Sequence, residues 1–147
     1  MLAESIDYKL PEKEKKSEYV ESKFDEIAQR YDLFNDLITF GMHRYWKKFV
    51  AKKTGLASGE NCLDICTGTG DIGRAVLKFQ PEIKVMALDF SSEMLELAHQ
   101  QQSENAHGLN YIRGDAMAPP FPKEYFEAVT VGYGLRNVAD LSVCIKN

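Results

Sequence analysis

The feature that most constrains this chain is a glycine-rich turn between a short apolar segment and the start of an amphipathic one. The stretch 61–73 reads Asn-Cys-Leu-Asp-Ile-Cys-Thr-Gly-Thr-Gly-Asp-Ile-Gly. Glycine accepts positive φ and, lacking a Cβ, lets a ligand lie against the backbone. We therefore expect a strand, a tight turn that holds a ligand, and a helix. Its three glycines also fit the spacing of the dinucleotide-binding fingerprint, G-x-G-x-x-G.

Acidic residues indicate which ligand this turn suits. A dinucleotide places a pyrophosphate at the helix N-terminus, where a neighbouring carboxylate is unfavourable. Here Asp64 precedes the turn, Asp71 follows it, and Asp89 and Asp115 end the next two apolar runs. An acidic cleft suits a ligand with positive charge and hydroxyl groups but no phosphate. S-adenosylmethionine, with its sulfonium, ammonium and ribose diol, is the stronger hypothesis, and a dinucleotide-dependent oxidoreductase is the weaker one.

The same stretch resembles the class I methyltransferase signature, a strand followed by D-x-G-x-G-x-G, with Cys66 where the first glycine is usual. The resemblance implies an α/β, Rossmann-like fold with strand order 3-2-1-4-5-7-6 and S-adenosylmethionine as cofactor. An acid about 20 residues after the glycine turn, here Asp89, is placed to accept both ribose hydroxyls, although it could instead cap a helix. Ser91 or Ser92 can take over that capping role. The expected cofactor-binding residues are Asp64, Thr67, Gly68, Thr69, Gly70, Asp89, Asp115, Ala116 and Gly132.

Two further motifs resemble the ubiquinone/menaquinone biosynthesis C-methyltransferase family. The first signature of that family is matched in order and spacing by Tyr31, Asp32, Asn35, His43 and Trp46. Two mild substitutions occur within it, Phe34 for Met and Thr39 for Ser. The second motif, Gly-Leu-Arg-Asn-Val at 134–138, also matches. The resemblance covers residues 19–140.

This resemblance implies methyl transfer from S-adenosylmethionine to a ring carbon of a prenylated dihydroxy-aromatic. The acceptor is expected to be demethylmenaquinol, with demethoxyubiquinol as the alternative. The chemistry requires an electron-rich ring and a group that arranges proton removal. Arg136 and Asn137 are the candidates for holding the ring oxygen, and His43 and Asp32 are the candidate bases. A methyltransferase with another acceptor and a non-catalytic relative that binds the cofactor remain open.

The chain is expected to have three parts. Residues 1–17 form a mixed-charge tail, residues 18–55 a helical lid that contacts substrate, and residues 56–147 a partial cofactor-binding domain. Only strands 3-2-1-4 of the seven-stranded sheet are expected, so strand four should lie at an edge with an unpaired apolar ladder. We interpret the chain as a fragment, a truncated gene product, or a half completed by another chain. A homodimer is the candidate assembly.

Composition and charge exclude some classes of binding partner and of cellular location. The formal net charge of -4 in 147 residues argues against a nucleic-acid binder. No apolar run has the length of a membrane span, and the N-terminus does not resemble a secretory signal. Three cysteines without a C-x-x-C motif predict a reduced, cytoplasmic protein, and scattered histidines predict no metal. The lysines around residues 47–53 form either a solvated face or a peripheral contact with anionic lipid.

Overall fold

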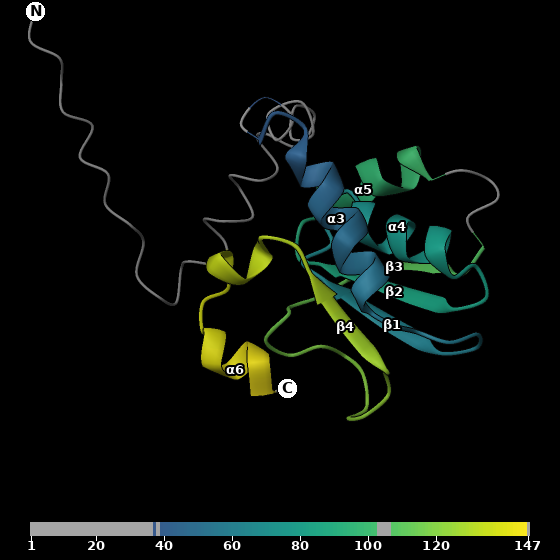
Figure 1. Ribbon diagram of the computed structural model, residues 1–147. Coiled ribbons are helices and arrows are strands. Elements are labelled where there is room, and N and C mark those ends of the chain that lie inside the picture. The colour runs from purple at the N-terminus through teal and green to yellow at the C-terminus, as the bar shows by residue number, and fades with distance from the viewer. Residues whose placement is uncertain (1–36, 38, 103–106, 147) are drawn as a thin grey trace, which may run out of the picture.

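A four-stranded parallel sheet forms the centre of the computed structural model, which describes residues 37, 39–102 and 107–146 (Figure 1). The strands are β1 (Asn61–Ile65), β2 (Lys84–Asp89), β3 (Leu109–Arg113) and β4 (Ala128–Val131). Their order is β3-β2-β1-β4, which confirms the expected Rossmann-like arrangement. The expected tail, residues 1–17, and residues 18–36 and 38 of the expected lid lie outside the described residues.

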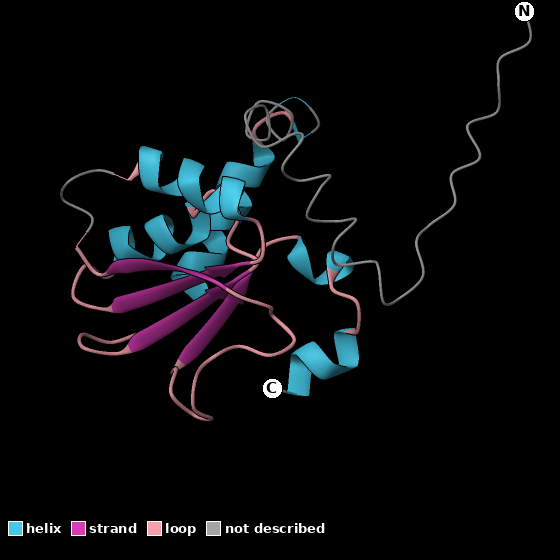
Figure 2. Ribbon diagram, turned by 180° about the vertical axis from the view of Figure 1, so that it is seen from behind, coloured by secondary structure: helices cyan, strands magenta, loops and turns pink. Residues whose placement is uncertain are grey.

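Three helices gather on one face of the sheet (Figure 2). They are α3 (Met42–Lys53), α4 (Asp71–Phe79) and α5 (Ser92–Gln101). The strands alternate in period two, so Cys62, Val85 and Ala87 face this helical layer and are fully buried. Ser91 is the N-cap of α5, where its Oγ accepts from the Met94 backbone N at 3.2 Å, so the expected serine cap is confirmed. In the described part of the chain no helix has the length and apolar character needed to cross a membrane.

The other face of the sheet is covered by irregular chain and by short helices. The connection from β3 to β4 contains no helix, and its Phe121 and Phe126 rings meet edge to face with centroids 4.9 Å apart. These rings pack with α6 (Leu141–Lys146) against Leu63 and Ile65 of β1. Within the described residues β4 pairs only with β1, and its Val129 is 57% exposed. The expected position of β4 at an edge is therefore confirmed.

A buried carboxylate joins β1 to the turn that follows it and to β4. Asp64 has no exposed surface, and it lies on the helical face of the sheet beside Gly73 of α4. Its Oδ2 accepts from the Thr67 hydroxyl at 2.6 Å, and its Oδ1 accepts from the Thr130 hydroxyl at 2.7 Å. Thr130 is also the β4 residue in register with Asp64. The carboxylate therefore sets the start of the glycine turn relative to two central strands.

Burial raises the pKa of the Asp64 carboxyl from its ordinary 3.8 to about 6, and hydrogen bonds from Thr67 and Thr130 hold back part of that rise. The folded chain therefore binds this proton more tightly than the unfolded chain does. The contribution of Asp64 to stability is complete below pH 4 and is lost as pH rises through about 6.

Asp64→Asn should remove this pH dependence. Relative to the variant, the free energy of unfolding of the unaltered chain should fall by about 3 kcal/mol between pH 4 and pH 6.5 and stay level above it. Urea unfolding followed by circular dichroism across that range measures the difference. Parallel stability curves for the two chains would contradict the assignment.

Thr130→Val provides a second variant that keeps the carboxylate. It removes one hydrogen bond to the ionised form, so the Asp64 pKa should rise further and the decline in stability should extend to higher pH. A profile that shifts toward lower pH would be inconsistent with the role of this hydroxyl.

Candidate functional site

A pocket opens at the carboxyl ends of the parallel strands, where loops from all four meet. This is the usual ligand position in open α/β sheets. Its wall is lined by Cys66, Gly68, Leu88, Asp89, Phe90, Ser91, Met94, Gly114, Asp115, Ala116, Met117, Gly132, Tyr133, Gly134, Arg136, Asn137, Val138 and Ala139. Two carboxylates and one guanidinium are the charged side chains of this wall, which is otherwise mostly apolar or backbone.

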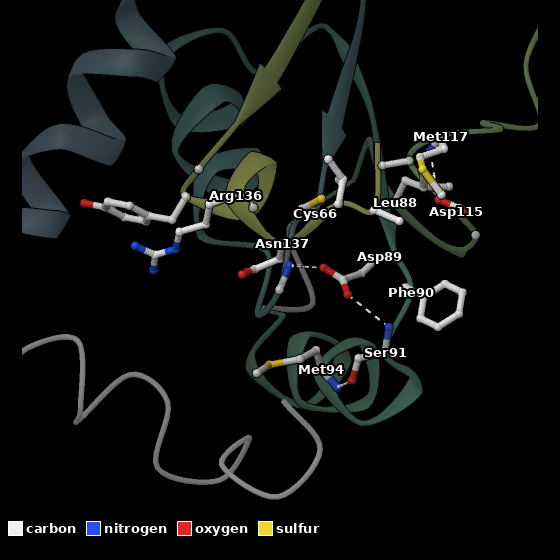
Figure 3. Close-up of a pocket in the computed structure, with 18 residues that line it drawn as sticks. Cys66, Leu88, Asp89, Phe90, Ser91, Met94, Asp115, Met117, Arg136 and Asn137 are labelled. Carbon is white, nitrogen blue, oxygen red and sulfur yellow. Dashed lines mark hydrogen bonds between the residues drawn. The ribbon is translucent and has the colours of Figure 1, made fainter. Parts of the chain in front are cut away.

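Asp89 is the most firmly oriented polar side chain of the wall. It ends β2, and its Oδ2 accepts from the Gly68 backbone N at 2.6 Å while its Oδ1 accepts from the Ser91 backbone N at 3.0 Å (Figure 3). These two amides fix the carboxylate between the glycine turn and the start of α5. An ionised carboxylate offers about four acceptor sites, so it can accept several hydrogen bonds at once. Asp89 therefore has the capacity to accept hydrogen bonds from a vicinal diol.

The β3 side of the pocket is formed by the segment 114–117. Asp115 Oδ1 accepts from the Met117 backbone N at 2.8 Å, which holds the segment 115–117 in a turn against the pocket. Met94, Phe90 and Met117 supply apolar surface to the pocket wall (Figure 3). Flat apolar walls with a few polar groups at the edge are suited to a heteroaromatic ring.

The opposite side of the pocket comes from the segment after β4. Tyr133 has φ +61° and starts the 3-10 helix η3 (Gly134–Asn137), which places Arg136 and Asn137 on the wall. The Arg136 guanidinium carbon is 5.8 Å from the centre of the Tyr133 ring. Trp46 of α3 meets the same ring edge to face at 6.4 Å. Helix α3 therefore contacts the rim of the pocket through aromatic side chains.

The structure brings seven of the predicted site residues together on the pocket wall. These are Gly68, Asp89, Asp115, Ala116, Gly132, Arg136 and Asn137. Asp32 lies outside the described residues. The other predicted residues, Asp64, Thr67, Thr69, Gly70 and His43, are not part of the wall.

Two of these five, Asp64 and His43, are buried. Asp64 was expected to contact the cofactor, but it lies behind the wall, where the hydroxyls of Thr67 and Thr130 bind its oxygens. His43 was expected as a base, but it is 2% exposed on the inner face of α3, and its backbone N is bonded to Thr39 Oγ1 at 3.3 Å. Both side chains point into the protein because the apolar periodicity of their elements places them on the packed face.

The remaining three, Thr67, Thr69 and Gly70, belong to the glycine turn and do not line the pocket. Gly70 has φ +84°, so a side chain at this position would be strained, and its Cβ would lie 2.6 Å from the Tyr111 hydroxyl. The Thr69 carbonyl accepts from Arg74 Nη1 at 2.6 Å, and the Thr67 carbonyl accepts from the Gly70 backbone N at 3.0 Å. The turn is thus held from both sides by α4 and by its own backbone.

An ion-pair cluster joins the first turn of α4 to α3. Lys47 Nζ is 2.5 Å from Asp71 Oδ2, and the Arg74 guanidinium contacts the other oxygen of the same carboxylate. Burial of Asp71 opposes ionisation, but the two cations outweigh it and lower the pKa of this carboxyl. Asp71 is therefore a structural anion that ties α3 to the end of the glycine turn.

Several wall residues were not predicted from the sequence. Ser91 and Met94 follow Asp89 at the start of α5, Met117 follows the predicted Asp115–Ala116 pair, and Tyr133 follows the predicted Gly132. Proximity to a predicted residue was the available signal in each case. Cys66 had been noted only as a departure from the signature.

Cys66 occupies a left-handed position, with φ +52°, where glycine would be unstrained. Its side chain fills the space that a side chain at Gly134 would need: a Cβ there would lie 2.1 Å from the Cys66 Cβ. Burial, together with nearby acidic groups, raises the pKa of the Cys66 thiol to about 12, so it stays protonated. The turns after β1 and β4 therefore fit together through one side chain.

Gly134→Ala should lower the free energy of unfolding by roughly 1–3 kcal/mol, because its methyl group overlaps Cys66. Cys66→Gly in the same chain should recover much of this loss, since it removes the overlapping atoms and suits the positive φ. A double-mutant cycle of urea unfolding measures the coupling. Additive losses in the double variant would show that the two residues do not share this space.

Among the residues that the structure describes, no three or more His, Cys, Asp or Glu side chains form a group that could hold a metal ion. The pocket carboxylates are instead paired with backbone amides.

Solved structures share this fold. A Haloferax volcanii protein in complex with the Trm112 methyltransferase activator matches 84% of this chain and 52% of its own, with a TM-score of 0.67 and 22% identity. A Methanococcus maripaludis protein matches 99% of this chain and 60% of its own, with a TM-score of 0.65 and 21% identity. An Aquifex aeolicus SAM-dependent methyltransferase matches 68% of this chain and 54% of its own, with a TM-score of 0.60 and 20% identity.

Sequence relatives are more similar. The ubiquinone/menaquinone biosynthesis C-methyltransferase UbiE of Hahella chejuensis is 38% identical over 140 residues, which cover 93% of this chain and 56% of the relative. The protein of the same name from Erwinia tasmaniensis is 35% identical over 136 residues, which cover 90% of this chain and 54% of the relative. The chain thus spans about half the length of the curated relatives that it matches.

A model of the ubiE/COQ5 methyltransferase family matches residues 12–147, which include every wall residue of the pocket. The match agrees with the parallel sheet, the glycine turn and the segment 134–138 at the rim of the pocket. The chain belongs to the ubiE/COQ5 methyltransferase family.

Proposed function

We propose that the pocket binds S-adenosylmethionine and that the protein of which this chain is a part or the whole transfers a methyl group to a carbon atom of a quinol. The observation that carries the proposal is the Asp89 carboxylate, held by two backbone amides at the carboxyl end of β2. Family membership and the names of the curated relatives support the same reaction class.

The residues of the wall fit the parts of this cofactor. Asp89 would hold the ribose diol, and Asp115 with the backbone of Ala116 would address the adenine edge between apolar side chains. The Gly68 and Gly132 backbones leave room for the methionine end, and the two wall carboxylates, Asp89 and Asp115, favour a ligand that carries positive charge. When bound, S-adenosylmethionine supplies an electrophilic methyl group.

Arg136 and Asn137 are the residues that we assign to the acceptor. Both lie on the wall across from the Asp115 side, and both can donate hydrogen bonds to a phenolic oxygen. A guanidinium beside that oxygen favours its ionised form, which raises electron density on the neighbouring ring carbon. Tyr133, close to Arg136, offers an aromatic surface on the same side. His43 is too deeply buried to serve as the base in this arrangement.

For the acceptor we propose a prenylated dihydroxy-aromatic, with demethylmenaquinol ahead of demethoxyubiquinol. The relatives' name covers both pathways, so it supports the class rather than the choice. A non-catalytic relative that binds the cofactor is the second candidate, because β4 is an edge strand in the described residues and the chain spans about half of its relatives.

Asp89→Ala should weaken S-adenosylmethionine binding to this chain at least about tenfold, or about 1.4 kcal/mol, because it removes the acceptor of the diol. Isothermal titration calorimetry measures the affinity. Glu96→Ala provides a matched control, since it removes an exposed carboxylate from α5 that is not part of the wall. Equal affinities of the two variants would contradict the proposed cofactor site.

Transfer of a labelled methyl group distinguishes the two candidate functions. The protein should methylate a ring carbon of the reduced naphthoquinol and leave the oxidised quinone unchanged, because the quinone ring lacks the required electron density. Arg136→Met should lower kcat at least about tenfold with little change in cofactor affinity. Cofactor binding without any transfer to either quinol would support the non-catalytic candidate instead.

A further inference from the structure

Helix α3 carries an unusual charge for this protein. Its sequence contains five cationic residues, Arg44, Lys47, Lys48, Lys52 and Lys53, and no acidic residue. The chain as a whole has a formal net charge of -4. Lys47 lies on the packed side, where it pairs with Asp71 of α4. The other four are exposed to solvent.

The exposed side of α3 is also aromatic. Tyr45 is 62% exposed, Phe49 is 51% exposed and Trp46 is 44% exposed, while His43 and Ala51 on the inner side are buried. We call the surface formed by these three rings with Arg44, Lys48, Lys52 and Lys53 the outer face of α3. Phe40, just before the helix, is 94% exposed and continues the apolar character.

This combination distinguishes between kinds of partner. A solvated helix needs no large exposed rings, and the cores of protein interfaces are depleted in lysine. Rings interleaved with lysine and arginine are characteristic of helices that lie in the interface of an anionic membrane. The Lys53 ammonium lies over the Phe49 ring, 5.6 Å from its centre, so a cation and a ring of this face are direct neighbours.

The outer face is continuous with the pocket. Trp46 contacts Tyr133, which lines the pocket beside Arg136, and α3 packs on α4 (Figure 1). The Lys47–Asp71 pair ties the helix to the end of the glycine turn. A surface that receives the outer face therefore lies next to the acceptor side of the pocket.

We propose that the outer face of α3 docks on an anionic lipid surface and presents the acceptor side of the pocket to a substrate held in the bilayer. The docking surface stands on the geometry of α3, and its link to a prenylated acceptor rests on the proposed function. Charge attraction brings the helix to the headgroups, and Tyr45, Trp46 and Phe49 enter the interface.

Vesicle flotation of the full chain tests this surface. The chain should bind phosphatidylcholine vesicles that contain phosphatidylglycerol, and bind them more weakly as salt rises. Lys48→Glu/Lys52→Glu should lower the affinity at least about tenfold. Tyr45→Ser/Phe49→Ser should also lower it, at unchanged charge. The matched control Lys84→Glu/Lys123→Glu alters two exposed lysines elsewhere by the same charge and should bind as the unaltered chain does.

Three results would overturn the proposal: equal binding to vesicles of phosphatidylcholine alone, an equal loss in the Lys84/Lys123 control, or no binding by the full chain. If the chain instead forms a dimer that the Phe49→Ser variant does not form, and does not bind vesicles, the outer face would be assigned to contact with a second copy of the chain. Two experiments test the proposed function without lipid. One is calorimetry with S-adenosylmethionine, and the other is methyl transfer to a naphthohydroquinone that has no prenyl tail. Their failure would count against the proposed function and leave the vesicle result standing.

Discussion

The buried carboxylate of Asp64 is the interaction on which the site depends. Its two oxygens bind hydroxyls from the turn after β1 and from β4, so one side chain sets the distance between the loops that form both sides of the pocket. Burial raises its pKa to about 6, which means that the fold accepts a cost in stability at neutral pH. A neutral residue would avoid that cost but could not accept from two hydroxyls in the same way.

The geometry of the pocket follows from this anchor through close contacts rather than through flexible side chains. The turn that Asp64 positions brings the Gly68 backbone N within 2.6 Å of Asp89, which links β1 to the end of β2. The same turn carries Cys66, whose Cβ occupies the space beside Gly134 after β4. The two sides of the pocket are therefore parts of one packed unit, and a shift in one turn requires a shift in the other.

Much of this arrangement could be predicted from local pattern. The helix Asp71–Phe79, the strand Ala128–Val131 and the acid at the end of β2 follow from apolar runs, a proline and glycines, because these signals act over a few residues. The serine cap of α5 was predictable for the same reason. The family signatures added the strand order, which local pattern does not specify.

What could not be predicted depends on which face of an element is packed and on contacts between distant segments. Asp64 alternates with Leu63 and Ile65 and so shares the helical face with Cys62, but a polar residue on that face is compatible with a ligand or with buried partners. Only the position of Thr130, 66 residues away, decides between them. Trp46 and Tyr133 present the same problem, because a motif ahead of the sheet and a motif after β4 meet only once α3 has packed on α4. Contacts of this kind join the helix with the cationic outer face to the rim of the pocket.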